Sequence, residues 1–217
     1  WQKLNTKNSK LPSNKILCVE TDKNKKYIGT TKGLVIVEKN KWKTYNKSNS
    51  NLPSNKIRKI KIKKDIVWIA TSSGLVRYSK GNFEVVFSMK KNQILDDDFT
   101  TMTIDENDCV WLGTNRGLYS YKESAWRVFN TNNSQLPNNH IRGVIVDKEN
   151  KKWIATKKGI VTIIDNEWSI FNKKNTPLKT NEIRSIVSDD YDRVWVGTEK
   201  GFVSYDGKRW EKHKINK

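Results

Sequence analysis

The sequence predicts an all-β protein, a β-propeller of five four-stranded antiparallel blades. Three observations predict it: a repeat over the whole chain, short runs rich in Val, Ile, Trp and Thr, and a glycine turn at one place in every repeat. The turn glycines Gly33, Gly74, Gly117, Gly159 and Gly201 follow one another after 41, 43, 42 and 42 residues. A fixed period of this length with four strands per unit is typical of propeller blades.

The elements of a repeat follow in a constant order. In the last copy, IRSIVSD (183–189) is the predicted strand a, VWVGT (194–198) strand b, FVSYD (202–206) strand c and RWEKHKI (209–215) strand d. Each run is short and rich in β-branched and aromatic residues. Between strands b and c we expect a hairpin whose glycine takes a positive φ and forms a bulge, which a residue with a Cβ does poorly.

We expect one domain, residues 1–217, because the repeats run from end to end without a linker. The predicted blades are residues 14–49, 55–91, 97–133, 139–175 and 181–217. The aromatic strand d phrase occurs six times, at Trp1, Trp42, Phe83, Trp126, Trp168 and Trp210. The surplus copy, residues 1–8, is expected to form an extra strand d that closes the ring on the fifth blade; the alternatives are a remnant of an upstream blade or an added strand on a neighbouring protomer.

The motifs carry a resemblance to a known family. LPSNKI (52–57), the pattern I-x-x-I-x-x-D and the pattern W-[IVL]-[GA]-T-x-x-G-[LIF] together resemble the two-component regulator propeller repeat of bacterial sensor proteins. The resemblance implies a ligand-sensing propeller outside the cytoplasm, often one for glycans, fused to a histidine kinase. This sequence departs from the family in having no kinase and only five repeats.

Charge and composition exclude several function classes. The net charge is +19, but the cations are 34 Lys against 8 Arg and fall in turns on both faces of the predicted blades, which does not favour nucleic acid. No apolar run approaches the roughly 20 residues of a membrane helix. Cys18 and Cys109 are expected to be buried apolar residues rather than a disulfide. The Cys and His spacing indicates no metal site, and we expect no cofactor.

The candidate binding residues lie on the face that carries the d-to-a and b-to-c loops. Arg58, Arg142 and Arg184 follow the first Ile of strand a in three repeats, where they would stand at the mouth of the central channel and could converge on an anion. The alternative is that they are framework residues bonded to loop carbonyls.

The loops around these arginines differ between repeats. The third repeat has Asp96, Asp97 and Asp98 where others read LPSNK, and His140 and Glu182 occupy the position of Asp98. Arg116 lies in a b-to-c turn of the same face. Loops that differ in sequence on a constant framework suit ligand binding. The alternative is that the three aspartates lie in a solvent-exposed turn whose sequence has diverged without a function.

The sequence therefore predicts a non-catalytic recognition or sensor module that binds an acidic or neutral oligosaccharide or an envelope protein. The alternatives are a propeller lyase or hydrolase that uses His140, Asp98 or Glu182, and a structural scaffold for protein interaction. We expect a monomer that is periplasmic, secreted or on the cell surface. The repeated tryptophans Trp68, Trp111, Trp153 and Trp195 are expected to pack between blades rather than to stack on sugars.

Overall fold

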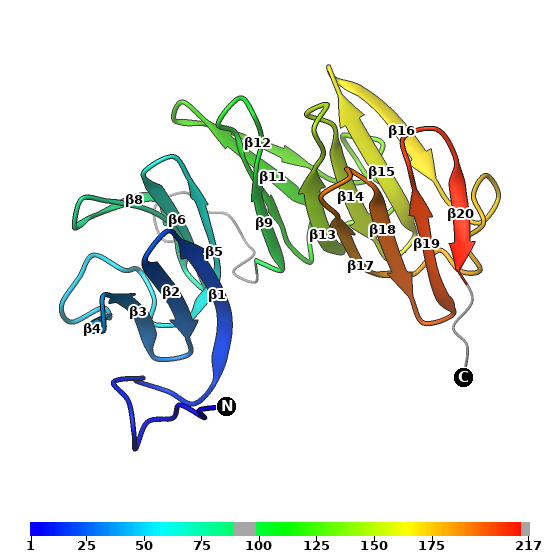
Figure 1. Ribbon diagram of the computed structural model, residues 1–217. Coiled ribbons are helices and arrows are strands. Elements are labelled where there is room, and N and C mark those ends of the chain that lie inside the picture. Colours follow the sequence, from blue (N-terminus) through cyan, green and yellow to red (C-terminus); the bar gives the residue numbers. More distant parts are fainter. Residues whose placement is uncertain (89–98, 214–217) are drawn as a thin grey trace. The chain divides into compact units, whose positions relative to one another are not determined.

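The computed structural model describes residues 1–88 and 99–213 (Figure 1). These residues form twenty strands in five four-stranded antiparallel sheets, and the described chain contains no helix. In every sheet the four strands follow one another in chain order and pair with their sequence neighbours. The predicted all-β class and the five sheets are thus confirmed. The chain divides into two compact units, residues 1–99 and 100–217.

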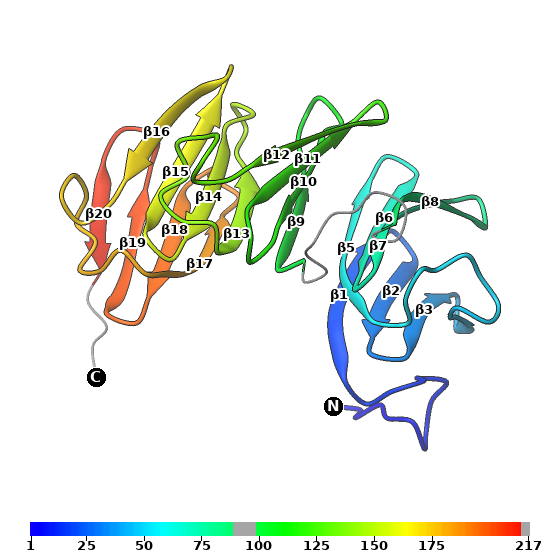
Figure 2. The same ribbon diagram turned by 180° about the vertical axis from the view of Figure 1, so that it is seen from behind.

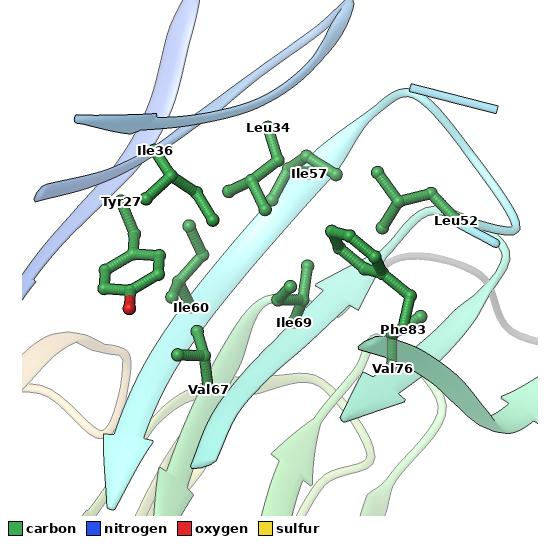
Figure 3. Close-up of a cluster of buried hydrophobic side chains, with 10 residues drawn as sticks. All are labelled: Tyr27, Leu34, Ile36, Leu52, Ile57, Ile60, Val67, Ile69, Val76 and Phe83. Atoms are coloured by element: carbon green, nitrogen blue, oxygen red, sulfur yellow. The ribbon is translucent and has the colours of Figure 1, made fainter. Parts of the chain in front are cut away.

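The first unit contains two sheets. The first consists of β1 (Ile16–Asp22), β2 (Lys25–Thr30), β3 (Gly33–Glu38) and β4 (Lys41–Tyr45). The second consists of β5 (Ile57–Lys63), β6 (Ile66–Thr71), β7 (Gly74–Ser79) and β8 (Asn82–Ser88). Their facing sides share one apolar core, in which Leu34, Ile57 and Ile69 are fully buried (Figure 3).

The second unit contains three sheets. The third consists of β9 (Thr101–Ile104), β10 (Val110–Gly113), β11 (Leu118–Lys122) and β12 (Ala125–Phe129). The fourth consists of β13 (Ile141–Val146), β14 (Lys152–Thr156), β15 (Gly159–Ile164) and β16 (Glu167–Phe171). The fifth consists of β17 (Ile183–Ser188), β18 (Val194–Thr198), β19 (Gly201–Tyr205) and β20 (Trp210–His213). The fourth and fifth sheets pack face to face, as both ribbon views show (Figures 1 and 2).

Strand β14 is buried on both sides because the fourth sheet packs against the third sheet on one side and the fifth sheet on the other. All five residues of β14 are buried, and Trp153 is 1% exposed. This explains why the b strands read as continuous apolar runs rather than as an alternation of apolar and polar residues. Trp68 and Trp111 are also buried, and Trp195 is half-buried. In the described residues the tryptophans of the b strands are therefore core residues.

The bulge lies in a different place from the predicted one. Thr30 pairs with Gly33 across a two-residue turn, without a register shift. Four shifts occur instead at the start of strand a, between Ile16 and Cys18 and at the same place in β5, β13 and β17. A further shift lies between β7 and β8, at Leu75 and Val76. The glycine turn needs no bulge because the positive φ of Gly33, +138°, already lets the chain reverse.

The N-terminal segment also differs from the prediction. The described structure has no strand before β1, so residues 1–8 form turns and loop rather than an extra strand d, and Trp1 is fully exposed. A strand needs a partner edge for its backbone hydrogen bonds. Every described strand d pairs with the strand c that precedes it in the chain, and residues 1–8 pair with no described strand. Closure of the sheets into one ring stays a prediction.

Candidate functional site

The bulge at the start of strand a places one side chain out of the regular alternation. In β5, β13 and β17 the residue left unpaired by the register shift is Arg58, Arg142 and Arg184, respectively. In β1 it is Leu17. A bulge re-aims the side chain of its extra residue, and such bulges often lie beside binding sites. The three arginines singled out in the sequence thus each lie at the same backbone bulge.

In the second unit the structure brings two of these arginines together on one carboxylate. Glu182 Oε1 lies 3.2 Å from Arg184 Nη1 and 3.8 Å from Arg142 Nη2. Arg184 Nη2 also lies 3.6 Å from Glu199 Oε2. All four side chains are partly exposed, between 29% and 50%. We call these residues the Arg142–Glu182 cluster; it holds two cations and two anions.

One polar atom of this cluster has no hydrogen-bond partner among the described residues. The Nε of Arg142 is buried and makes no hydrogen bond within the part of the chain that the structure describes. A buried N–H without a partner costs roughly 1–3 kcal/mol, so it favours a ligand or water that can accept from it. Arg58 occupies the equivalent bulge in the first unit and is half-buried.

Asparagine side chains hold the loops between strands d and a in one shape. In the loop before β13, Asn133 Oδ1 accepts from Asn130 N at 2.8 Å and Asn133 Nδ2 donates to Val128 O at 2.9 Å. Asn139 Oδ1 accepts from Thr131 N at 2.8 Å. The same bonds recur in three other loops, through Asn5, Asn8 and Asn14, through Asn46, Asn49 and Asn55, and through Asn172, Asn175 and Asn181.

The leucine of the LP motif anchors each of these loops. Leu11, Leu52, Leu136 and Leu178 are all at least 92% buried. The N-terminal copy, residues 5–15, folds into this same loop although it lacks a strand before it. The phrase that opens the chain therefore supplies an anchored loop beside β1. These asparagines are framework residues, which the composition alone does not reveal.

The remaining predicted site residues lie in loops of the third and fourth repeats or outside the described residues. His140 ends the loop before β13, is half-buried, and its backbone N–H donates to Asn138 Oδ1. Arg116 is exposed in the turn between β10 and β11. Asp97 and Asp98 fall within residues 89–98, outside the described ranges.

A threonine completes each glycine turn on this face. Thr114 Oγ1 donates to Gly117 O at 3.0 Å and accepts from Arg116 N at 3.0 Å. The same pair of bonds recurs at Thr30, Thr71, Thr156 and Thr198. The T-x-x-G part of the repeat thus builds a rigid turn, and the variable residues between Thr and Gly are presented to solvent.

The acidic turns between strands a and b hold tryptophans in place. Trp111 Nε1 donates to Asp105 Oδ2 at 2.9 Å, and the other carboxylate oxygen accepts from the backbone of residues 107 and 109. Asp147 with Trp153 and Asp189 with Trp195 repeat this arrangement. The sequence pattern D-x-x-x-x-x-W was the available signal, and sequence reasoning missed it. These carboxylates serve the fold.

One of these carboxylates is also part of a buried ion pair. Lys152 Nζ lies 3.2 Å from Asp105 Oδ2, and both side chains are at least 90% buried. Burial alone would raise the pKa of Asp105, but the hydrogen bonds from Trp111 and Cys109 and the Lys152 ammonium outweigh it and lower the pKa. Lys152 stands where Val67, Val110 and Val194 stand in other copies.

Both cysteines are free thiols whose surroundings disfavour the reactive thiolate form. Cys109 is buried and Cys18 is half-buried, and both are free thiols. Burial raises the pKa of each to about 11, so neither is a thiolate at neutral pH.

Within residues 1–88 and 99–213, no three metal-binding side chains come together. No helix suited to crossing a membrane occurs in these ranges.

Comparison with known proteins places these features in a family context. The family model described as "two component regulator propeller" matches residues 177–200, which include the Arg142–Glu182 cluster residues Glu182, Arg184 and Glu199. No curated protein matches the sequence. The resemblance inferred from the repeat motifs is confirmed by this match.

Several bacterial proteins are among the solved structures with similar folds. The extracellular domain of the putative hybrid two-component system BT3049 from B. thetaiotaomicron superposes with a TM-score of 0.76 at 22% identity, over 95% of this chain and 30% of that domain. The extracellular domain of the putative one-component system BT4673 gives 0.73 at 21% identity, over 88% and 27%. Virginiamycin B lyase from Staphylococcus aureus gives 0.73 at 15% identity, over 94% and 71%. This chain thus spans less than a third of the two sensor domains.

Proposed function

Because the chain carries a two-component regulator propeller repeat, we propose that it is a non-catalytic recognition module of the sensor type. Its binding face is the one that carries the d-to-a and b-to-c loops. The observation that carries the proposal is the Arg142–Glu182 cluster, in which bulged arginines from two neighbouring strands meet on one carboxylate. The asparagine-bonded loops and threonine-bonded turns give this cluster a rigid support. Preorganised polar groups lose little entropy when a ligand binds.

The charge balance of the cluster bears on the class of ligand. Glu182 and Glu199 offset the charges of Arg142 and Arg184. A free anion would have to compete with these carboxylates, whereas a polyhydroxylated ligand can donate to the carboxylates and accept from the guanidinium groups. We therefore favour a neutral oligosaccharide over an acidic one. An envelope protein that presents polar side chains is the second candidate partner.

The location and the absence of catalysis belong to the same proposal. The two sensor structures with similar folds are described as extracellular domains, which supports a periplasmic, secreted or cell-surface location. A lyase shares the fold, but Glu182, one of the predicted catalytic candidates, is engaged by two arginines. A general base must be able to reach the proton that it removes. The arrangement therefore favours binding over catalysis.

Calorimetric titration with a panel of neutral and acidic oligosaccharides tests the proposal. We expect a neutral member to bind the wild type and to bind the Arg142→Ala/Arg184→Ala variant at least tenfold more weakly, since hydrogen bonds to charged groups contribute about 1.5–3 kcal/mol each. An Arg58→Ala variant tests whether the first unit contributes.

Arg127→Ala is the matched control, because Arg127 is an exposed arginine on β12 outside the cluster. Equal binding by the control, the double variant and the wild type would show that Arg142 and Arg184 are framework residues. Turnover of any panel member would favour the enzyme alternative.

A further inference from the structure

The hairpin between β3 and β4 differs in charge from its counterparts. The first repeat has Lys39, Lys41 and Lys43 at three alternate positions of the turn and strand d. By strand register, the fourth repeat has Asp165, Glu167 and Ser169 at these positions, and the second has Lys80, Asn82 and Glu84. All three lysines are exposed. The repeat symmetry gives no structural reason for three cations here.

These lysines border two adjoining hollows between the first and second sheets, on the side of the a-to-b and c-to-d turns. The larger has a volume of about 600 Å³ and the smaller about 300 Å³. Both are lined by Lys25, Lys43 and Glu38, together with three tyrosines. A volume of this order accommodates a small ring compound. Both hollows lie entirely within the first compact unit.

The apolar wall of the hollows is a cluster of aromatic rings. Tyr45 and Tyr78 have ring centroids 6.2 Å apart, and both pack on Phe83, at 4.9 Å and 4.6 Å. Tyr27, which is 4% exposed, completes the tyrosine lining. Burial and a hydrogen bond with Tyr45 raise the pKa of Tyr78 far above neutrality. The phenol of Tyr78 therefore keeps its proton and bonds with Tyr45, and the O–H of this tyrosine pair that is not used between the two rings can donate to an anion.

The charge of this site is not balanced. Six lysines line the two hollows, Lys23, Lys25, Lys39, Lys41, Lys43 and Lys80, against three acids, Asp22, Glu38 and Asp65. One ion pair is formed among them, Lys25 with Glu38 at 3.4 Å. Neighbouring cations repel one another, and an anion bound among them relieves this repulsion.

The corresponding hollow in the second unit provides a comparison. It lies between the third and fourth sheets, has a volume of about 500 Å³, and is lined by three cations, Lys122, Arg127 and Lys152, and two anions, Glu123 and Asp165. Lys152 is already neutralised by Asp105. A hollow between sheets is thus common to both units, and the excess of positive charge is specific to the first.

We propose that the hollow between the first two sheets binds a small cyclic compound that carries a carboxylate or a sulfate. The ring packs against the tyrosines, and the anionic group lies among Lys25, Lys41 and Lys43, with the remaining O–H of the Tyr45–Tyr78 pair as a further donor. This site is separate from the Arg142–Glu182 cluster and does not depend on it.

Calorimetric titration of the full chain at low ionic strength tests the proposal, with glucuronate, benzoate and inorganic sulfate as probes and glucose as the neutral reference. We expect the ring anions to bind and glucose not to bind. A Lys41→Gln/Lys43→Gln variant should bind about tenfold more weakly, and Tyr78→Phe should also weaken binding while keeping the ring. Raising the salt to 0.5 M should weaken binding because the contact is electrostatic and exposed.

The matched control removes two exposed lysines elsewhere, Lys173→Gln and Lys179→Gln in the loop before β17. It changes the net charge by the same amount and should bind like the wild type. The proposal is overturned if no ring anion binds the wild type, if both lysine pairs weaken binding equally, or if sulfate binds as well as the ring anions and Tyr78→Phe has no effect.

Discussion

At the residue scale, Gly117 is required for two reasons that one control can separate. Its φ is +142°, and a Cβ at this position would collide with the carbonyl of Phe129. We expect Gly117→Val to lower the free energy of unfolding by about 2–4 kcal/mol, as the sum of conformational strain and overpacking. Chemical denaturation measures this.

Gly81→Val is the control, because Gly81 also has a positive φ, +87°, but a Cβ there meets no atom within 4 Å. It should cost only about 1–2 kcal/mol. Equal losses for the two variants would mean that the collision with Phe129 is relieved by a small shift of β12.

Asp105 and Lys152 give the second prediction at this scale. Asp105→Asn leaves a buried ammonium without its counter-charge and should lower the free energy of unfolding by about 3 kcal/mol. Adding Lys152→Val, the residue type found in three other repeats, should restore much of the loss. Denaturation of the two single variants and the double variant forms a cycle, and additive losses would contradict the coupling.

The same carboxylate gives a pH dependence. Because the folded-state pKa of Asp105 is lowered, its contribution to stability is complete above the unfolded value of about 3.9 and is lost as the pH falls through the folded value. Stability measured between pH 6 and pH 2 should therefore fall more steeply for the wild type than for Asp105→Asn. Parallel curves would show that other acids dominate acid unfolding.

At the scale of elements, the asparagine-bonded loop sets the start of strand a. Asn133→Ala removes bonds to Asn130 N and Val128 O in the loop before β13. We expect a loss of about 1–3 kcal/mol in the free energy of unfolding, because these backbone groups lose a partner. Asn132→Ala, an exposed neighbour, should change stability by less than about 0.5 kcal/mol. If the two variants lose the same free energy of unfolding, the burial of Leu136 stabilises the loop rather than the hydrogen bonds of Asn133.

At the scale of the molecule, the N-terminal segment tests how the sheets are completed. Deleting residues 1–8 removes Asn5 and Asn8 from the first loop. We expect the melting temperature to fall by about 2–8 °C, which corresponds to one or two lost hydrogen bonds in a chain of this size. A fall of more than about 10 °C would show that the segment also pairs as a strand and closes a ring. Size-exclusion chromatography should show a monomer before and after the deletion.

The sequence by itself determined the all-β class, the five sheets and the boundaries of most strands, because each depends on local patterns repeated five times. Glycine turns and β-branched runs act within a few residues, and repetition raises their signal. The sequence also singled out Arg142 and Arg184, because both occupy the same position in their repeats.

Only the tertiary structure decided what those residues touch. Glu182 lies beside both arginines because a register shift re-aims their side chains, and a shift of one residue leaves no trace in composition. The cationic hollow combines Lys25, Lys43 and Tyr78 from three strands and two sheets. Such sites depend on how neighbouring sheets pack, and packing is set by side chains far apart in the chain. Sequence periodicity therefore predicts the frame, and contacts between sheets decide the sites that the frame presents.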